Sequence, residues 1–98
     1  MFSGGDYHEV ARWLGNFATS HARREDLRAE CVLDTHGQRE GTSYGLRVKV
    51  ADRLSSEIEV RFADVAAGRG GMVWCRSLAD RVRGLVRDAA GHGSLRPA

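Results

Sequence analysis

Apolar and polar residues alternate in three consecutive stretches of the chain, and this alternation limits the fold more than any other feature. The stretches cover about residues 27–33, 44–51 and 57–63. Such alternation is typical of antiparallel strands with one buried and one solvated face. A one-residue slip would turn every apolar side chain to water, so the pattern also fixes the pairing register. The residues expected to face the core are Leu27, Ala29, Cys31 and Leu33, then Tyr44, Leu46, Val48 and Val50, then Ile58, Val60 and Phe62.

One amphipathic helix is expected on each side of this sheet. The first covers about residues 7–22, with Asp6 as its N-cap and Glu9 at the spacing of a capping box. The second covers about residues 72–90 and follows a glycine-rich break at residues 68–71. Each helix has one apolar side. The element order therefore predicts an α+β fold: an α-β-β-β-α two-layer sandwich with both helices packed on one face of a three-stranded antiparallel sheet.

The length of 98 residues fits a single domain. We expect an ordered core at about residues 6–90 and a flexible tail at about residues 91–98. Hydrophobic residues make up 42% of the chain and charged residues 29%, as in soluble globular domains. No secretory signal and no apolar run of membrane-spanning length is present, so a cytoplasmic location without membrane contact is expected.

A group of arginines surrounds the start and one side of the second helix. Arg69 precedes this helix, and Arg76, Arg83 and Arg87 lie close together in angle along it. Free N–H groups at a helix N-terminus favour anions, so a phosphate, nucleic-acid or acidic partner could use this face. The candidate anion-binding set is Arg69, Gly70, Gly71, Arg76, Arg83 and Arg87. Against it, Asp80 can pair with these arginines, and no phosphate-loop motif follows the glycines.

The element order is similar to that of double-stranded RNA-binding domains, which also run α-β-β-β-α and enter their last helix through a basic loop. The resemblance covers most of the chain and rests on order alone. That family has a cluster of lysines at the start of the last helix, whereas this chain has Met72-Val73-Trp74-Cys75-Arg76 there. Its members bind RNA through charge and shape, and the net charge of this chain is only +2. We therefore assign no family on this basis.

Patterns for catalysis and metal binding are sparse. The four histidines and two cysteines show no His-x-x-x-His or Cys-x-x-Cys spacing, so no metal and no cofactor is expected. A cysteine near a helix N-terminus favours the thiolate, which makes Cys75 a candidate nucleophile with His21 as its candidate base. Cys31 and Cys75 both fall on apolar faces, where a free cysteine packs as a small apolar residue. The sequence thus favours a non-enzymatic protein over an enzyme.

The solvated face of the sheet carries charges of both signs. In a simple meander the central strand places Arg47 and Lys49 beside Glu30 on one neighbour and Glu57 and Glu59 on the other. Opposite charges on neighbouring strands stabilise a sheet by roughly 0.2–1 kcal/mol per pair. We expect this face to neutralise itself rather than to bind a partner.

Apolar residues at the edges of the helical stripes point to an interaction surface. Three strands offer little room for two long helices, so some of Trp74, Val73 and Tyr7 are expected to stay exposed, which often marks an interface. Free sheet edges are commonly closed by pairing with another chain. We therefore expect a small binding or adaptor module that acts through self-association, as a homodimer, or through a protein partner. The alternative is a nucleic-acid or phosphate-binding module that uses the arginines of the second helix.

Overall fold

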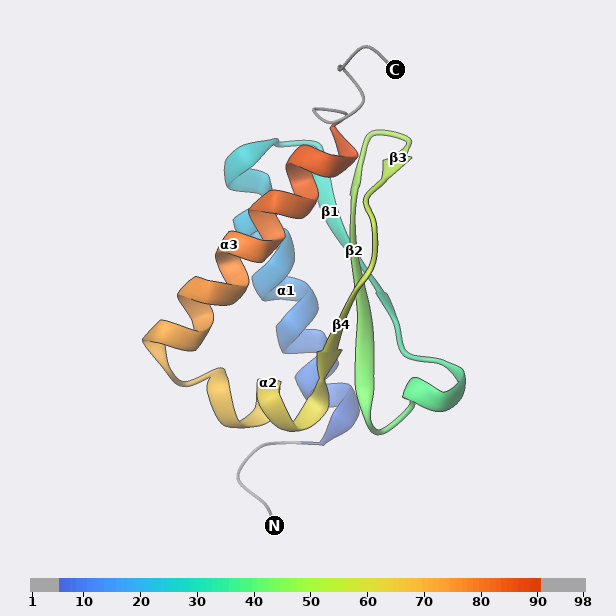
Figure 1. Ribbon diagram of the computed structural model, residues 1–98, viewed down its shortest axis with the longest axis vertical. Helices are drawn as coiled ribbons and strands as arrows, with labels where there is room; N and C mark the ends of the chain where they lie inside the picture. Colours follow the sequence, from blue (N-terminus) through green and yellow to red (C-terminus); the bar gives the residue numbers. More distant parts are fainter. Residues whose placement is uncertain (1–5, 91–98) are drawn as a thin grey trace.

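The computed structural model describes residues 6–90, which form a helical layer packed on one face of an antiparallel sheet (Figure 1). The elements are α1 (Tyr7–Glu25), β1 (Ala29–Asp34), the 3-10 helix η1 (Gly37–Arg39), β2 (Ser43–Val50), β3 (Arg53–Leu54), β4 (Ile58–Arg61), α2 (Phe62–Gly68) and α3 (Met72–Ala89). The predicted α+β class, with helices packed on an antiparallel sheet, is confirmed. The expected tail at residues 91–98 lies outside the described residues.

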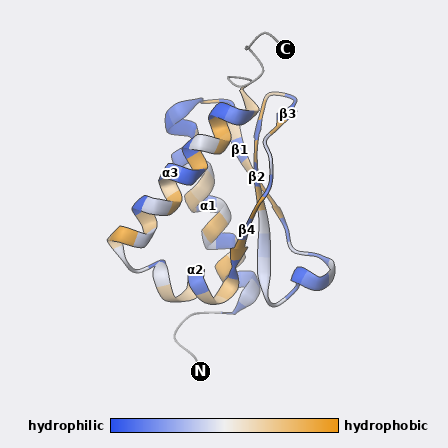
Figure 2. Ribbon diagram, viewed as in Figure 1, coloured by the Kyte–Doolittle hydropathy of each residue, from blue (hydrophilic) through white to orange (hydrophobic). Residues whose placement is uncertain are grey.

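Strand β2 is central and carries much of the core. It pairs with β1 on one side and with β3 and β4 on the other, all antiparallel. Its inward residues, Tyr44, Leu46, Val48 and Val50, are all buried. The register sets Cys31 of β1 beside Val48, and Val60 of β4 beside Tyr44. The apolar sides of the helices and of the sheet face one another (Figure 2), so the alternation predicts the core side of β2 correctly.

Helix α1 begins where the capping pattern predicts. The Oδ1 atom of Asp6 accepts a 2.7 Å hydrogen bond from the backbone N–H of Glu9, which satisfies one of the free donors of the first turn. Arg23 and Arg24 lie in the last turn, where positive charge complements the helix dipole. None of the helices in the described part of the chain combines the length and the apolarity needed to cross a bilayer.

Strand β1 begins at Ala29, two residues later than the alternation predicts. A turn precedes it, because the N–H of Ala29 donates to the carbonyl of Asp26 at 2.9 Å and the carboxylate of Asp26 binds Arg28. Leu27 lies in this turn and is 86% exposed, so its predicted inward position is wrong. Local hydrogen bonds outweigh the burial of one leucine here.

The predicted third strand, residues 57–63, is also wrong in its limits. A two-residue turn first leads into β3, and a kink follows in which the N–H of Val48 donates to Oγ of Ser55 instead of to a backbone carbonyl. Strand β4 then ends at Arg61, because Phe62 begins the short helix α2. Helix α2 was not predicted, because its seven residues are too few for a clear helical period.

The turn between β2 and β3 holds Ala51 at a φ of 58°, a region that L-residues avoid at a cost of roughly 1–2 kcal/mol. We expect Ala51→Gly to raise the free energy of unfolding by about 0.5 kcal/mol, because the relieved strain exceeds the roughly 0.5–1 kcal/mol of chain entropy that glycine loses. Urea denaturation measures the change. Asp52→Gly is the control, since Asp52 has no positive φ, and it should not stabilise the protein.

Candidate interaction groove at the edge of the sheet

The two edges of the sheet differ in how their backbone groups are satisfied. Successive residues of an edge strand direct their N–H and C=O groups alternately toward and away from the neighbouring strand. On β1, the outward N–H of Cys31 donates to Oγ1 of Thr19 at 3.0 Å, and the outward carbonyl of Ala29 accepts from Nε of Arg23 at 3.0 Å. Both partners belong to α1, so this helix caps two of the outward backbone groups of the β1 edge.

The edge formed by β4 is open. The N–H of Phe62 donates to the carbonyl of Thr42 at 2.8 Å, and Tyr44 pairs with Val60, so the even-numbered residues of β4 bond to β2. The N–H groups of Glu59 and Arg61 therefore point away from the sheet. Among residues 6–90, no side chain caps these two groups as Thr19 caps Cys31.

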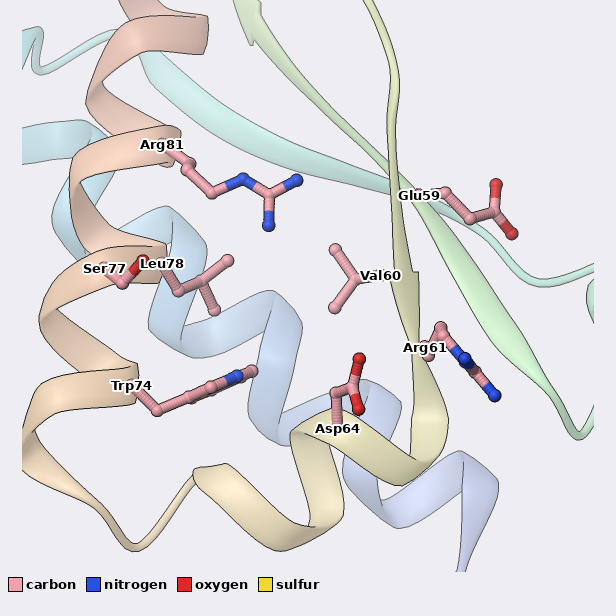
Figure 3. Close-up of a pocket in the computed structure, with 8 residues that line it drawn as sticks. All are labelled: Glu59, Val60, Arg61, Asp64, Trp74, Ser77, Leu78 and Arg81. Carbon is pink, nitrogen blue, oxygen red and sulfur yellow. The ribbon is translucent and has the colours of Figure 1, made fainter.

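A hollow lies beside this open edge, between β4, α2 and α3 (Figure 3). Val60, Leu78 and Trp74 form its apolar part, and Arg81 and Asp64 approach it from opposite ends. Glu59 and Arg61 point to the other side of the strand. The hollow measures about 160 Å³, below the roughly 300–1,000 Å³ of small-molecule pockets.

Trp74 is held in the groove by a glycine on α2. A Cβ atom on Gly68 would lie 2.5 Å from the Trp74 ring, so only glycine lets the indole lie this close to α2. On its other side Trp74 approaches Trp13 of α1, with ring centroids 6.4 Å apart. Close packing on two sides leaves Trp74 partly buried at the wall of the groove.

The structure separates the three residues predicted for an interface. Val73 is 81% exposed and Trp74 lines the groove, but Tyr7 is buried and is not available on the surface. The first turn of α1 packs over the start of β2, where the Tyr7 ring stacks on Tyr44 at 4.6 Å and its hydroxyl donates to the carbonyl of Ser43. Burial is the main cause that raises the pKa of both tyrosines.

The predicted anion-binding arginines are spread over two ends of the helical layer. Arg83 and Arg87 both lie near Glu25 at the end of α1, at 3.7 and 3.6 Å, whereas Arg69 binds Glu9 at its start, at 3.2 Å. Arg76 is exposed between them.

The glycine-rich turn and Asp80 complete the predicted anion-binding region. Gly71 is the N-cap of α3, and its N–H donates to the carbonyl of Gly68. Gly70 is exposed. Asp80 does not turn aside but lies 3.6 Å from Arg83. These arginines mainly join α1 to α3.

The candidate pair of Cys75 and His21 lines a second hollow, between α1 and α3. The Cys75 thiol lies 3.4 Å from the carbonyl oxygen of Arg69, and Nδ1 of His21 has no hydrogen-bond partner among the described residues. Burial, followed by the charges of Arg24 and Arg83, lowers the pKa of His21. The two side chains are thus close to the same hollow without forming a hydrogen-bonded pair.

Cys31 and Cys75 are both free, and Cys31 packs against the core. Burial raises the pKa of Cys31 to about 12, so its thiol stays protonated and unreactive. Within residues 6–90 no cluster of three or more histidine, cysteine or carboxylate side chains is arranged to hold a metal ion.

An arginine from the loop before β2 organises the open face of the sheet. Arg39 donates to Asp34 at 2.6 Å, to Glu57 at 2.7 Å and to Glu59 at 3.0 Å. Its guanidinium lies over Gly45, where a Cβ atom would come within 2.8 Å of Arg39 Cζ and within 2.6 Å of a Glu57 oxygen. The predicted self-neutralising face is therefore present, but its main cation comes from a loop that alternation could not place.

The predicted cation of β2, Arg47, also takes part, at 3.4 Å from Glu57. Lys49 stands opposite Glu30 in the register, with no ion pair between them. The hydrogen bond from Arg39, and then that from Ser43, holds the pKa of Glu59 below its usual value. Hydrogen bonds from His36, followed by the nearby Arg39, lower the pKa of Asp34 in the same way.

Comparison of this chain with protein-family models, with curated proteins and with solved structures finds no match. The groove and the charges around it are therefore the features from which a function can be inferred.

Gly68→Ala should displace Trp74 from the groove wall, because the added Cβ would overlap the ring. We expect a loss of about 1–3 kcal/mol in the free energy of unfolding, as for other overpacked sites. The change in tryptophan fluorescence, recorded in a Trp13→Phe background, reports the displacement. Gly70→Ala is the matched control, since nothing lies within 4 Å of its Cβ position. Equal effects of the two variants would contradict this account of Gly68.

Arg39→Met should destabilise the protein at pH 7, and the loss should depend on pH. Arg39 lowers the pKa of Glu59 from its ordinary 4.5 in the folded state, so the pairing stabilises the fold above that pH and is lost as the pH falls through the lowered pKa. Chemical denaturation from pH 7 to pH 3 should show the difference from wild type shrinking below about pH 4.5. Arg12→Met, which removes an exposed arginine, should show little effect at either end.

Proposed function

We propose that this chain is a small, non-enzymatic binding module that acts through its open β4 edge, either on a second copy of itself or on another protein. One observation carries the proposal: α1 caps outward backbone groups of β1, whereas the outward N–H groups of β4 are uncapped and border a groove with polar and charged side chains around the ring of Trp74. An exposed strand edge is a template for strand addition, in which backbone hydrogen bonds supply affinity and neighbouring side chains supply specificity.

The apolar wall beside the edge adds to this argument. Val60 and Leu78 are already buried in the chain, so a partner strand along β4 would mainly cover the exposed part of Trp74. Val73 stands one turn before Ser77 on α3 and extends this surface. The two free cysteines agree with the cytoplasmic location that belongs to this proposal.

The alternative, binding of nucleic acid through the arginines of α3, has less support. Glu25 lies within 4 Å of both Arg83 and Arg87, and Glu9 pairs with Arg69, so a phosphate would have to displace carboxylates already in place. Size-exclusion chromatography with light scattering, at low and high salt and with added nucleic acid, separates the two functions. Binding of nucleic acid that falls steeply with salt would favour the alternative.

Arg61 provides a sharp test of strand addition. Its φ of −80° suits proline, and its N–H points out of the sheet, so Arg61→Pro should remove an edge donor and leave the fold intact. Arg61→Ala removes the same side chain but keeps the N–H. A photo-crosslinking residue placed at position 77, which lines the groove, forms covalent adducts with any partner that contacts it in the cells that produce this protein. We expect Arg61→Pro to reduce its adducts by about tenfold and Arg61→Ala to reduce them less.

The control places the same photo-crosslinking residue at Ser20, an exposed serine on α1 that does not line the groove. Mass spectrometry of the adducts distinguishes a second copy from a different protein. Adducts at position 77 that match those at position 20, or that survive Arg61→Pro unchanged, would refute the proposed function.

A further inference from the structure

The exposed edge of β4 is complementary to itself in charge. Glu59 and Arg61 flank Val60, and both side chains point to the open face of the sheet (Figure 3). If two copies pair antiparallel about a two-fold axis at Val60, Glu59 of each copy faces Arg61 of the other. We infer that the occupant of the groove is a second copy of this chain, bound β4 to β4 with Val60 opposite Val60. This inference rests on the proposed function and names the partner of the same site.

The charges select this register over its neighbours. Within β4, the outward groups are those of Glu59 and Arg61, so a symmetric pair can shift only in two-residue steps that keep odd-numbered residues opposite one another. One shift sets Glu59 against Glu59, and the other sets Arg61 against Arg61. Like charges directly opposite destabilise a strand pair. The register centred on Val60 is therefore the one with opposite charges at both positions.

A second pair of charges obeys the same symmetry. Arg81 approaches the groove from one end and Asp64 from the other, with Val60 between them (Figure 3). A two-fold axis at Val60 exchanges the two ends, so Arg81 of one copy is brought to the end that holds Asp64 of the other. The proposed contact between Glu59 and Arg61 lies on the outer face of the sheet. The proposed contact between Arg81 and Asp64 lies on the helical side. Two independent pairs thus fit the same axis.

These charges are available for a partner. Arg61, Arg81 and Asp64 are exposed, and none of them forms an ion pair within residues 6–90. The side chain of Glu59 remains 49% exposed although it binds Arg39, so its carboxylate can accept from a second cation. On the inner side, Val60 is already buried, and the partly exposed Trp74 of each copy borders the paired edge.

Sedimentation velocity of the purified full chain tests the inference directly. We expect a reversible dimer whose dissociation constant rises by about tenfold or more in Arg61→Glu, because two opposite-charge contacts become like-charge contacts. Arg61 makes no ion pair within residues 6–90, so this variant should fold normally. Arg53→Glu is the matched control, because it has the same charge change at an exposed position on β3 and lies outside the proposed contact.

The second pair permits a test by mixing. Asp64→Arg and Arg81→Asp should each dimerise weakly alone, since each sets like charges together across the axis. In an equal mixture the two chains complement each other at both ends, so the heterodimer should recover the affinity of the wild type. Recovery of this kind depends on contact between copies and cannot come from a change in the stability of one chain.

Each outcome separates this inference from the proposed function. A wild-type dimer that is indifferent to Arg61→Glu and to the mixed variants would overturn the register argued here. A chain that stays monomeric up to roughly 1 mM, but whose position 77 forms adducts with a different protein that Arg61→Pro removes, would overturn self-pairing and keep the binding module. A monomer without such adducts would refute both.

Discussion

The packing of α1 against β1 decides which edge of this sheet can meet another chain. Thr19 and Arg23 face the strand and satisfy the outward backbone groups of Cys31 and Ala29. Ala18 and Ala22, both fully buried, allow the helix to come close enough for these bonds. Helix α1 packs mainly against β1, and α3 packs against β2 on the same face of the sheet (Figure 1). Neither helix caps the outward backbone groups of β4. The fold thus produces one closed and one open edge from a sheet with no covalent closure.

Arginine is abundant in this chain, and its placement matters more than its number. Arg39 is shared among three carboxylates, and Arg83 and Arg87 lie against Glu25. Exposed ion pairs of this kind stabilise a protein only slightly, but they lower the net field that a nucleic acid would meet. Near β4, Arg61, Arg81 and Asp64 carry charges of both signs and form no ion pair within residues 6–90. A surface of mixed sign suits a protein partner better than a polyanion.

Regular periodicity made the core predictable, and local exceptions made the site hard to predict. Alternation identified the buried residues of β2, and the helical period identified α1 and α3. Alternation failed at Leu27, where a turn delays the start of the strand to Ala29, and at Phe62, where a seven-residue helix replaces the end of a strand. Tyr7 and Arg39 find their partners across the fold, at Tyr44 and Glu59, so no local pattern indicates them. The groove needs the tertiary arrangement of β4, α2 and α3, although free sheet edges and Trp74 were signals that the sequence did contain.

The short length of β4 sets both the strength and the limit of pairing through this edge. Before β4, the chain is kinked at Ser55, and the N–H of Ser56 donates to Asp88, so the strand cannot extend further in that direction. After β4, helix α2 begins at Phe62. Only a few backbone groups remain for a partner, so the pairing should be reversible rather than permanent. The proposed two-fold pair uses the outward groups of Glu59 and Arg61, while α1 occupies outward groups of Cys31 and Ala29 on the opposite edge. In this proposal, assembly through β4 would close at two copies, because the two-fold axis pairs each β4 edge with the other and α1 covers part of the opposite edge.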